Sequence, residues 1–544
     1  MPDVTRREFL GVVGIAVAVV ALSSVPYLLG YLSATPDTEF GGFLIDLDDS
    51  YSHLAKMQQG VWDGWRYRIL FTPEEHPGAY LNTFYVALGK LSVLLHLSVI
   101  QTYQLARLTC GLALLVTSYI FLSLFLESKE RRLVAYLLVC FSSGLGWLVL
   151  LVGSATLAGL SPIDFWLMDA YTFFAILTFP HLTAAMTLLL LFFLLALKYM
   201  ETSRVWPLLA GSLALVGLVV IQPFAALLVD GILGVYWALL FLRRRRPPSR
   251  EALAFAIWAL APLPLLAYYY KAFISDPVFQ SWSAQNLLPS PPFVHLVAGY
   301  GFLLPLAIGG TVHVIRHMGE RASLLIAWVG SALLLAYLPF ALQRRMLEGL
   351  HIPLCVLATV GLLECLLPAL LRLSWLKRLA AWRKYDERGL RRLLIYCAIM
   401  ATSPSNLYLL AGSSLAAIHH DPSLYYGLGE TEAVDWLSSN TERTDTVLAS
   451  YPIGRLIPAR AGNRVFVGHF IETVEVERKR ELAATFFNGD TSDGFRHTLI
   501  SEYGIRYVFH GPRERELGDF DPSGSEYLTP AFRNSEVCIY RVRT

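Results

Sequence analysis

Three aspartates lie within four positions of one another in the segment GGFLIDLDDSYSHLAKMQQG, residues 41–60. A carboxylate in such a place can act as a general base, bind a metal ion or cap a helix. Asp46 lies between Ile45 and Leu47, where an acid is costly unless it is paired or used. Asp46 is therefore the first choice for a catalytic base, followed by Asp48, with Asp49 as the third candidate.

A helix is expected directly after these aspartates. Leu54, Met57 and Val61 recur at the spacing of one helix face, which predicts an amphipathic helix lying on a membrane surface. Ser50 or Asp49 would be its N-cap, because an oxygen side chain there accepts hydrogen bonds from the free N–H groups of the first turn. On this alternative, one aspartate caps the helix and the others are only solvated.

Further polar residues follow in the same loop. The segment FTPEEHPGAY, residues 71–80, holds two carboxylates and an imidazole that could bind a metal or a sugar, or form only a polar turn. If a divalent ion such as Mg²⁺ or Mn²⁺ is used, its candidate ligands are Asp48, Asp49 and Glu74; no other cofactor is predicted. The residues of this loop that could contact a substrate are Tyr51, His53, Lys56, Glu74, Glu75 and His76.

Two adjacent arginines form a second group with possible chemistry. Arg344 and Arg345 belong to the segment LQRRMLEGLHIP, residues 342–353. A guanidinium offers forked donors and a fixed charge that suit a phosphate or diphosphate, and His351 could assist. The alternatives are ordinary lipid headgroups or a salt bridge to Glu348.

The composition places these residues in a membrane protein. The chain has 544 residues, of which 55% are hydrophobic and only 16% charged, and its mean hydropathy is +0.50. A soluble protein of this size would carry about 25% charged residues, so a polytopic α-helical membrane protein is expected. The six cysteines form no CxxC pair, which gives no zinc or redox site. We expect membrane lipids, and no nucleic acid, as partners.

Clusters of lysine and arginine mark the cytoplasmic loops, and a helical hairpin fits between successive clusters. About 11 spans result, with a cytoplasmic N-terminus in the cell (plasma or inner) membrane. His181 then lies at the outer start of a span, as a candidate substrate contact or a packed polar residue, and Asp230 lies inside one. The expected spans are 9–33, 103–126, 133–153, 174–197, 205–222, 223–242, 251–272, 292–314, 322–341, 350–371 and 391–413.

The tail from about residue 414 is predicted to be extracytoplasmic. Short β-type runs alternate there with helical runs, which predicts a small α/β domain over 414–544. Four of its polar residues could contact an acceptor or only line loops: Tyr451, Arg455, His469 and Glu472. The preceding domain, 1–413, would hold the spans and a first outer loop, 34–102. In that loop, residues 78–97 are predicted to form an interfacial helix rather than a span.

This layout resembles the GT-C superfamily of membrane glycosyltransferases. The likeness rests on DLDDSYSHLAKMQQG, on HPGAYLNTFYVALGKL followed by ARLTCGLALLVTSYIFLSLFLESKERR, and on RRMLEGLHIPL. The second stretch is similar to the interfacial helix and following span of the mannosyl- and aminoarabinosyl-transferase types. The Asp-Glu pair of many members is replaced here by Asp-Leu-Asp-Asp, so the resemblance does not select one aspartate.

The resemblance implies an enzyme that moves a sugar from a polyprenyl-phosphate donor to a lipid, glycan or protein acceptor. An outer-loop aspartate would be the base for an inverting attack on the anomeric carbon. Arg344, Arg345 and His351 would bind the departing lipid phosphate. Two other classes remain as alternatives. A transporter or lipid flippase should show paired broken helices and acids at mid-membrane depth, and a non-catalytic assembly protein would use its tail for contacts.

Overall fold

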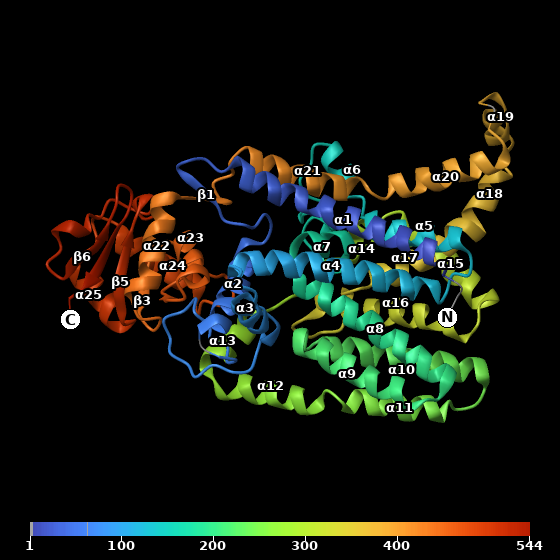
Figure 1. Ribbon diagram of the computed structural model, residues 1–544, viewed down its shortest axis with the longest axis horizontal. Coiled ribbons are helices and arrows are strands. Elements are labelled where there is room, and N and C mark those ends of the chain that lie inside the picture. Colours follow the sequence, from blue (N-terminus) through green and yellow to red (C-terminus); the bar gives the residue numbers. More distant parts are fainter. Residues whose placement is uncertain (1–3, 63, 384, 544) are drawn as a thin grey trace. The chain divides into compact units, whose positions relative to one another are not determined.

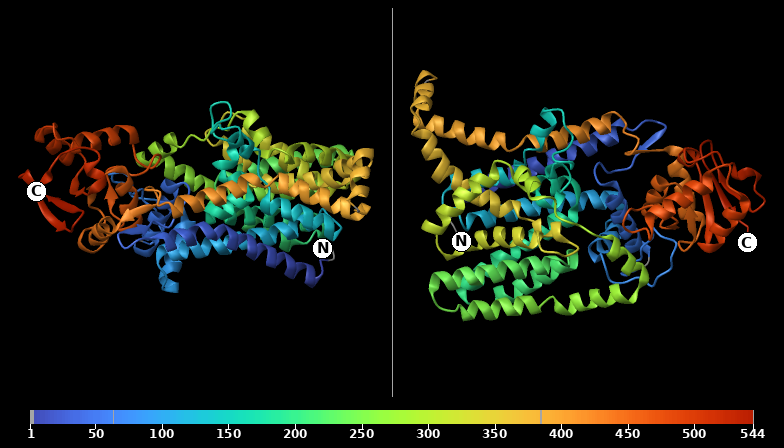
Figure 2. Two further views of the ribbon diagram at one scale, coloured as in Figure 1. Left: turned by 90° about the horizontal axis from the view of Figure 1, so that it is seen from above. Right: turned by 180° about the vertical axis from the view of Figure 1, so that it is seen from behind.

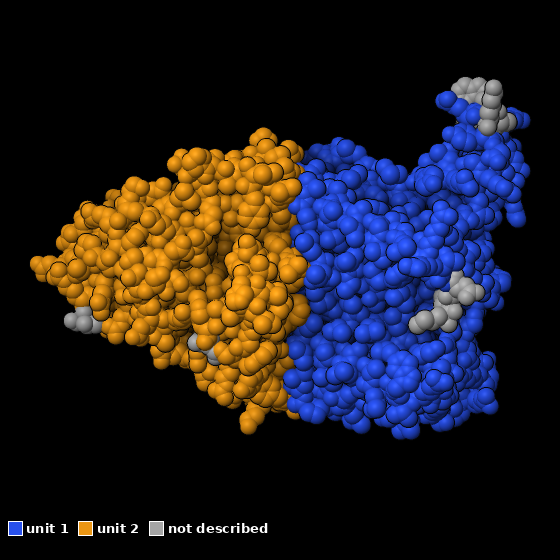
Figure 3. All heavy atoms as spheres, in the orientation of Figure 1, with its two compact units in different colours: residues 1–25, 107–266, 288–412 blue, residues 26–106, 267–287, 413–544 orange. Residues whose placement is uncertain are grey.

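The computed structural model describes residues 4–62, 64–383 and 385–543 and is mostly helical. The chain divides into two compact units (Figure 3). Unit 1 comprises residues 1–25, 107–266 and 288–412, and unit 2 comprises residues 26–106, 267–287 and 413–544. Unit 2 therefore joins most of the first predicted outer loop to the tail.

Unit 1 is built from long apolar helices that run alongside one another in all three ribbon views (Figures 1 and 2). Within it α8 packs against α9, α10 against α16, and α15 against α17. Its helices, some of which extend into unit 2, are α1 (Arg6–Ser33), α4 (Val99–Ser123), α5 (Lys129–Phe141), α6 (Gly146–Leu151), α7 (Thr172–Thr178), α8 (Pro180–Thr202), α9 (Val205–Ile221), α10 (Ala225–Arg244), α11 (Ser249–Leu260), α12 (Leu263–Ser275), α14 (Phe293–Tyr300), α15 (Leu303–His317), α16 (Ser323–Ala336), α17 (His351–Val360), α18 (Leu367–Leu371), α19 (Ser374–Trp382), α20 (Glu387–Ala401) and α21 (Pro404–Ile418). Short 3-10 or π turns connect several of them: η1 (Ile163–Phe165), η2 (Met168–Ala170), η3 (Glu320–Ala322), η4 (Gln343–Leu347) and η5 (Gly361–Leu366).

Six helices of the described chain are long and apolar enough to cross a membrane, so this is a multi-pass membrane protein. They are α1, α4, α8, α10, the continuous pair α11–α12 and the stretch from α17 to α18. The count becomes eight if two bent pairs each form one span, namely α14 with α15, bent by 86°, and α20 with α21, bent by 48°.

The predicted count of 11 is therefore not confirmed, and three expected spans account for the difference from the upper count of eight. Residues 133–153 are divided between α5 and α6, because Ser142, Ser143 and Gly144 interrupt the helix. α9 and α16 have 17 and 14 residues. At 1.5 Å per residue they are shorter than the roughly 30 Å hydrocarbon core. The hydropathy of an apolar run does not show where a helix ends within it, so the sequence overestimates the number of spans.

Unit 2 contains a mixed five-stranded sheet in the order β4-β3-β5-β7-β6. β3 pairs in parallel with β4 and β5, whereas β7 pairs antiparallel with β5 and β6. A separate antiparallel pair joins β1 (Thr38–Phe40) to β2 (Tyr425–Gly427). The five strands are β3 (Thr446–Leu448), β4 (Arg464–Val465), β5 (Ile505–His510), β6 (Leu528–Arg533) and β7 (Cys538–Val542).

Helices surround this sheet and the first loop. They are α2 (Leu47–Trp62), α3 (Thr83–Leu95), α13 (Pro277–Gln285), α22 (Leu428–Asn440), α23 (Tyr451–Arg460), α24 (Val476–Phe487), α25 (Asp493–Glu502) and α26 (Pro512–Arg515), with a 3-10 turn, η6 (Pro522–Gly524). The runs TVLAS, RVFVG, IRYVFHG and VCIYRV of the tail predict strands, and β3, β4, β5 and β7 form within them. The runs EAVDWLSSN, EVERKRELAATFF and GFRHTLISEYG predict helices and fall in α22, α24 and α25. Four further elements of the tail were not predicted: β2, β6, α23 and α26. Pro530 lies in β6 and Pro458 in α23, and proline is a poor signal for either element. β2 and α26 have only three and four residues. α3 has 13 residues, which reach only about 20 Å.

Candidate active site

The helix that follows the aspartates begins earlier than the sequence suggests. α2 starts at Leu47, so Asp46, rather than Ser50 or Asp49, occupies the position before the helix. The carboxylate of Asp46 accepts the backbone N–H of Asp49, and its carbonyl accepts the N–H of Ser50 at 3.0 Å. Asp46 has a φ of 49°, which is uncommon for a residue other than glycine. The predicted N-cap is thus wrong, and Asp46 is the capping residue.

α2 is enclosed by protein and is not the surface helix that its apolar stripe predicted. Ten of its 16 residues are buried, and α3 and α23 pack against it. Gly60 and Gly89 permit close contact with α3, because a Cβ on Gly89 would lie 1.9 Å from the carbonyl oxygen of Met57. The prediction failed because polar side chains on the other faces of α2 are buried against partners distant in the sequence.

Asp48 is held by two residues of α23. The guanidinium of Arg455 donates to Asp48 Oδ1 at 3.1 Å, and the hydroxyl of Tyr451 donates to Oδ2. Arg455 also donates to the hydroxyl of Tyr426 at 3.3 Å and lies 5.2 Å from the ring centroid of Tyr51. The charge of Asp48 is therefore compensated by Arg455, and the ion pair anchors α23 to α2.

Asp49 faces the imidazole of His469, whose Nε2 lies 3.3 Å from Asp49 Oδ1. His469 is buried, and its Nδ1 accepts the backbone N–H groups of Ile471 and Glu472 at 3.0 and 3.1 Å. A nitrogen that accepts two hydrogen bonds carries no proton, so the remaining ring proton is on Nε2. Asp49 keeps 32% of its side chain exposed, so a substrate can reach it.

Two glycines allow His469 and Arg455 to approach neighbouring aspartates. A Cβ on Gly454, in α23, would lie 1.9 Å from the carbonyl oxygen of Val467, and one on Gly468 would lie 2.3 Å from that of Gly454. α23 and the segment after β4 therefore cross at backbone contact. This crossing fixes the positions of Arg455 and His469, which directly follow Gly454 and Gly468.

The environment separates the acidities of Asp46 and Asp49. Burial, followed by the negative charges of Asp49 and Asp48, raises the pKa of Asp46 to about 7. Burial acts in the same direction on Asp49, but the adjacent imidazole of His469 and the nearby ammonium of Lys56 more than offset it and hold the pKa of Asp49 far below its ordinary value. At neutral pH Asp49 is ionised, whereas Asp46 is protonated in part of the molecules and ionised in the rest.

Lys56 is part of a buried network of hydrogen bonds and ion pairs that holds α2 in place. Its Nζ lies 3.0 Å from Glu472 Oε1, and Glu472 also accepts the hydroxyls of Ser52 and Tyr67, both at 2.7 Å. Burial alone would raise the pKa of Glu472, but Lys56 and its other partners lower it. The sequence placed Lys56 among the candidate substrate contacts, whereas the structure gives it an anchoring role.

The residues of the Glu-Glu-His turn have separate partners. Glu74 lies 2.6 Å from Lys479, and Glu75 lies 2.9 Å from Arg464 and is largely exposed. His76 accepts the N–H of Ile69 at 2.7 Å, and its Nδ1 lies 3.0 Å from Asp276. They do not form one cluster.

The candidate metal ligands have cationic partners or neighbours instead. Asp48 is paired with Arg455, and Glu74 with Lys479. Among the residues that the structure describes, no group of three or more His, Cys, Asp or Glu side chains is arranged to hold a metal ion.

Tyr51 and His53, in α2, take part in packing. The hydroxyl of Tyr51 donates to the carbonyl of Gly41 at 3.3 Å, and its ring contacts that of Phe43. The ring of His53 stacks on Tyr85 with centroids 4.0 Å apart. Both side chains are buried, so they shape the unit rather than open onto a substrate.

The arginine motif lies in unit 1, in η4. Arg345 lies 3.1 Å from the buried carboxylate of Asp169, and the guanidinium of Arg344 lies 5.3 Å from the ring centroid of Trp166. Both arginines are half-buried. The acid partner of Arg345 is thus Asp169, and not Glu348, which the sequence offered as an alternative to a phosphate.

Glu348, which the sequence suggested only as a salt-bridge partner of the arginines, is a buried acid. It is 1% exposed, and neither of its oxygens has a hydrogen-bond partner among the described residues. Burial, reinforced by the charge of Asp169, raises its pKa well above the ordinary value. Its position three residues after Arg345, in a segment that is apolar on both sides, was the available signal.

The two candidate histidines of unit 1 are less accessible than the sequence suggested. His351 is 1% exposed, and its ring nitrogens lie 2.9 Å from the hydroxyl of Ser142 and 3.0 Å from that of Thr172. His181 is the second residue of α8, half-buried, with its ring 5.4 Å from that of Phe179. His351 therefore supports the segment that carries the arginines.

No protein-family model matches the sequence, and no curated protein sequence does either. Solved structures do match the fold. An oligosaccharyltransferase from Archaeoglobus fulgidus, tethered to an acceptor peptide, superposes with a TM-score of 0.52 at 13% identity, over 93% of this chain and 69% of that one. ArnT from Cupriavidus metallidurans, bound to undecaprenyl phosphate, superposes with a TM-score of 0.50 at 12% identity, over 96% and 97%.

Proposed function

We propose that this chain, which has the fold of the GT-C membrane glycosyltransferases, transfers a sugar from a polyprenyl-phosphate donor to an acceptor at the extracytoplasmic face of the cell membrane. One observation carries the proposal. Asp46 and Asp49 lie at the start of one helix, and their pKa values are shifted in opposite directions. Neighbouring acids whose environments separate them in this way are typical of acid–base sites.

In the proposed reaction Asp46 is the general base. Its carboxylate removes the proton from an acceptor hydroxyl as the hydroxyl oxygen attacks the anomeric carbon of the sugar. The bond between that carbon and the lipid phosphate oxygen breaks, and the phosphate leaves with the bonding electron pair, so the anomeric configuration inverts. A pKa of about 7 suits this role, because a base works best when its pKa is near the operating pH.

Asp49 has a positioning role in this scheme. Its Oδ1 lies 3.3 Å from His469 Nε2, and its backbone N–H donates to Asp46. Its fixed negative charge also raises the proton affinity of Asp46. Asp48, which the sequence placed second as a base, is unsuited because Arg455 and Tyr451 already occupy its two oxygens.

The lipid phosphate of the donor is assigned to Arg344 and Arg345 by their chemistry. A planar guanidinium can bind two phosphate oxygens at once, and the negative charge that develops on the leaving phosphate is stabilised by such donors. Arg345 is already oriented by Asp169. The leaving group is a lipid phosphate, so the reaction needs no nucleotide.

Removal of the Asp49 charge is expected to move the acid limb of the pH–rate profile to lower pH. Asp49→Asn keeps the size of the side chain and the backbone N–H that donates to Asp46. It removes a negative charge that raises the pKa of Asp46, so Asp46 stays deprotonated to a lower pH. The measurement is kcat/KM between pH 5 and 9, with release of polyprenyl phosphate followed in nanodiscs that contain labelled polyprenyl-phosphate sugars and cell-envelope acceptors. An unmoved limb would exclude Asp46 as the titrating group.

Arg344→Ala is expected to raise the KM for the donor or to lower kcat by roughly 10- to 100-fold, the effect of losing a charge-assisted hydrogen bond. Arg344→Lys should recover only part of the loss, because an ammonium cannot form the fork. Arg246→Ala, an exposed arginine of unit 1, is the matched control. If Arg344→Ala and Arg246→Ala behave alike, the donor phosphate binds elsewhere.

A further inference from the structure

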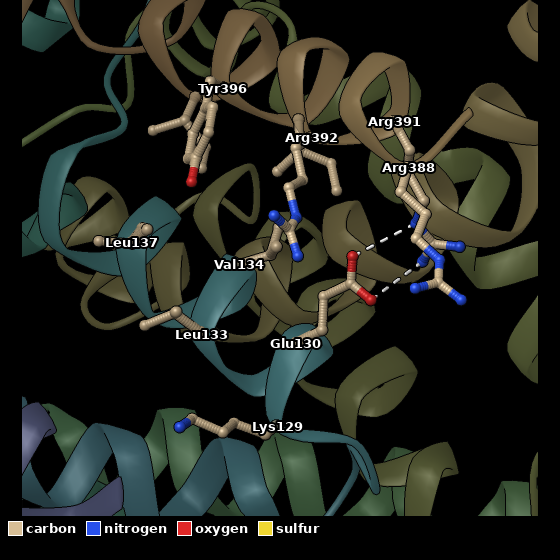
Figure 4. Close-up of a pocket in the computed structure, with 11 residues that line it drawn as sticks. Lys129, Glu130, Leu133, Val134, Leu137, Arg388, Arg391, Arg392 and Tyr396 are labelled. Atoms are coloured by element: carbon tan, nitrogen blue, oxygen red, sulfur yellow. Dashed lines mark hydrogen bonds and ion pairs between the residues drawn. The ribbon is translucent and has the colours of Figure 1, made fainter. Parts of the chain in front are cut away.

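A groove in unit 1 lies between α5 and α20, apart from every residue used above. Its volume is about 550 Å³ (Figure 4). The lining changes in character along the two helices, from charged residues at their N-terminal ends to apolar residues one to two turns later. A groove of this kind matches a ligand with a charged head and an apolar tail.

The charged end carries an excess of positive charge. Its lining residues are Lys129, Glu130, Arg388, Arg391 and Arg392. Arg391 lies 3.3 Å from Glu130. Among the described residues, the other three cations have no acidic partner within 4.0 Å. Figure 4 shows the Arg392 guanidinium extending from α20 toward α5. The groove therefore offers three uncompensated positive charges to a ligand.

The apolar end is built from the same two helices. Leu133 and Leu137 lie one turn apart on α5, which also contributes Val134. Ile395 and Ile399 lie one turn apart on α20. Val134, Ile395 and Ile399 are buried. From Lys129 to Leu137 the helix rises about 12 Å, enough for a headgroup and the first part of an acyl chain.

The charge pattern also fixes which leaflet this end faces. Lysine and arginine concentrate in cytoplasmic loops, so the charged end lies at the cytoplasmic headgroup level and the apolar end faces the hydrocarbon. Tyr396, which lines the groove and is 60% exposed, is of the type enriched at that boundary. We propose that the groove between α5 and α20 binds an anionic phospholipid of the cytoplasmic leaflet.

Charge complementarity selects this occupant over others. A zwitterionic lipid would leave the three positive charges uncompensated, and an apolar helix from another chain would bury them at high cost. Basic pockets between membrane helices at the cytoplasmic side favour anionic headgroups by about one order of magnitude or less per cation. The proposal does not depend on the proposed sugar transfer.

The test is native mass spectrometry of the full-length protein titrated with phosphatidylglycerol or phosphatidylcholine of the same acyl chains. The wild type should bind phosphatidylglycerol more tightly. Arg388→Gln with Arg392→Gln should weaken phosphatidylglycerol binding about 30-fold and leave phosphatidylcholine binding unchanged. Both arginines are exposed, so the fold tolerates the change.

Three further arms make the result decisive. Arg245→Gln with Arg246→Gln removes the same charge directly after α10, elsewhere in unit 1, and should have no effect. Leu137→Trp should fill the apolar end and weaken binding of both lipids. Soluble glycerol 3-phosphate should bind far more weakly than phosphatidylglycerol. Equal loss in both arginine pairs, no effect of Leu137→Trp, or equal binding of glycerol 3-phosphate would each overturn the proposal.

Discussion

Asp46→Asn is expected to lower kcat for sugar transfer by about 10²- to 10⁴-fold, the usual contribution of a positioned general base. Asparagine has the shape of aspartate and can still accept the N–H of Asp49 at the start of α2, so the helix cap is preserved. The amide cannot accept a proton from the acceptor hydroxyl. The loss should therefore appear in kcat, with donor binding little changed.

The pH dependence provides an independent readout. In the wild type, kcat/KM should fall tenfold per pH unit below about pH 7, because Asp46 is then protonated. In Asp46→Asn the residual rate should lack this limb. Asp421→Asn is the matched control, since the side chain of Asp421 is exposed and its carboxylate accepts hydrogen bonds from Ser423 in the same turn. Full activity in Asp46→Asn, with loss in Asp49→Asn or Asp48→Asn, would transfer the role of base to a neighbour.

Arg455→Met is expected to destabilise the protein by about 3 kcal/mol, the low end of the cost of removing one partner from a buried ion pair. Asp48 would lose its cation while 18% of its side chain remains exposed, so water relieves part of the cost. The quantity to measure is the free energy of unfolding in mixed micelles at fixed lipid composition.

Two further variants identify the source of this loss. Asp48→Asn combined with Arg455→Met should be more stable than Arg455→Met alone, because no uncompensated charge remains. Arg460→Met, on the same helix, is the matched control. Arg460 pairs with Asp435 and Glu39, which are 55% and 42% exposed, and exposed pairs contribute about 0–1 kcal/mol. If both single arginine variants lose the same stability, the Asp48–Arg455 pair has no special role.

Much of the local structure could be read from the sequence. The apolar composition predicted a multi-pass helical protein, and the structure has six to eight candidate spans. The alternation in the tail predicted β3, β4, β5 and β7, because an alternating strand pattern is a property of neighbouring residues. The predicted count of 11 spans was not confirmed, because helix ends such as Ser142 lie inside apolar runs.

The roles of the three aspartates depend on contacts with residues that are distant in the sequence. Tyr451 and Arg455, which occupy Asp48, lie 403 and 407 positions away along the chain. His469, which faces Asp49, is similarly distant. No spacing rule connects residues that far apart. Their positions depend on the close crossing at Gly454 and Gly468.

The sequence by itself determined that this is a membrane protein with an acidic segment after its first apolar helix, since hydropathy and residue type are local properties. It also placed Asp46 first, on the ground that an acid between Ile45 and Leu47 is costly. Only the tertiary structure decided that Asp46 precedes α2, that Asp48 is paired with an arginine and that Asp49 faces a histidine. A pKa depends on burial and on charges within a few ångströms, and folding alone brings those charges together.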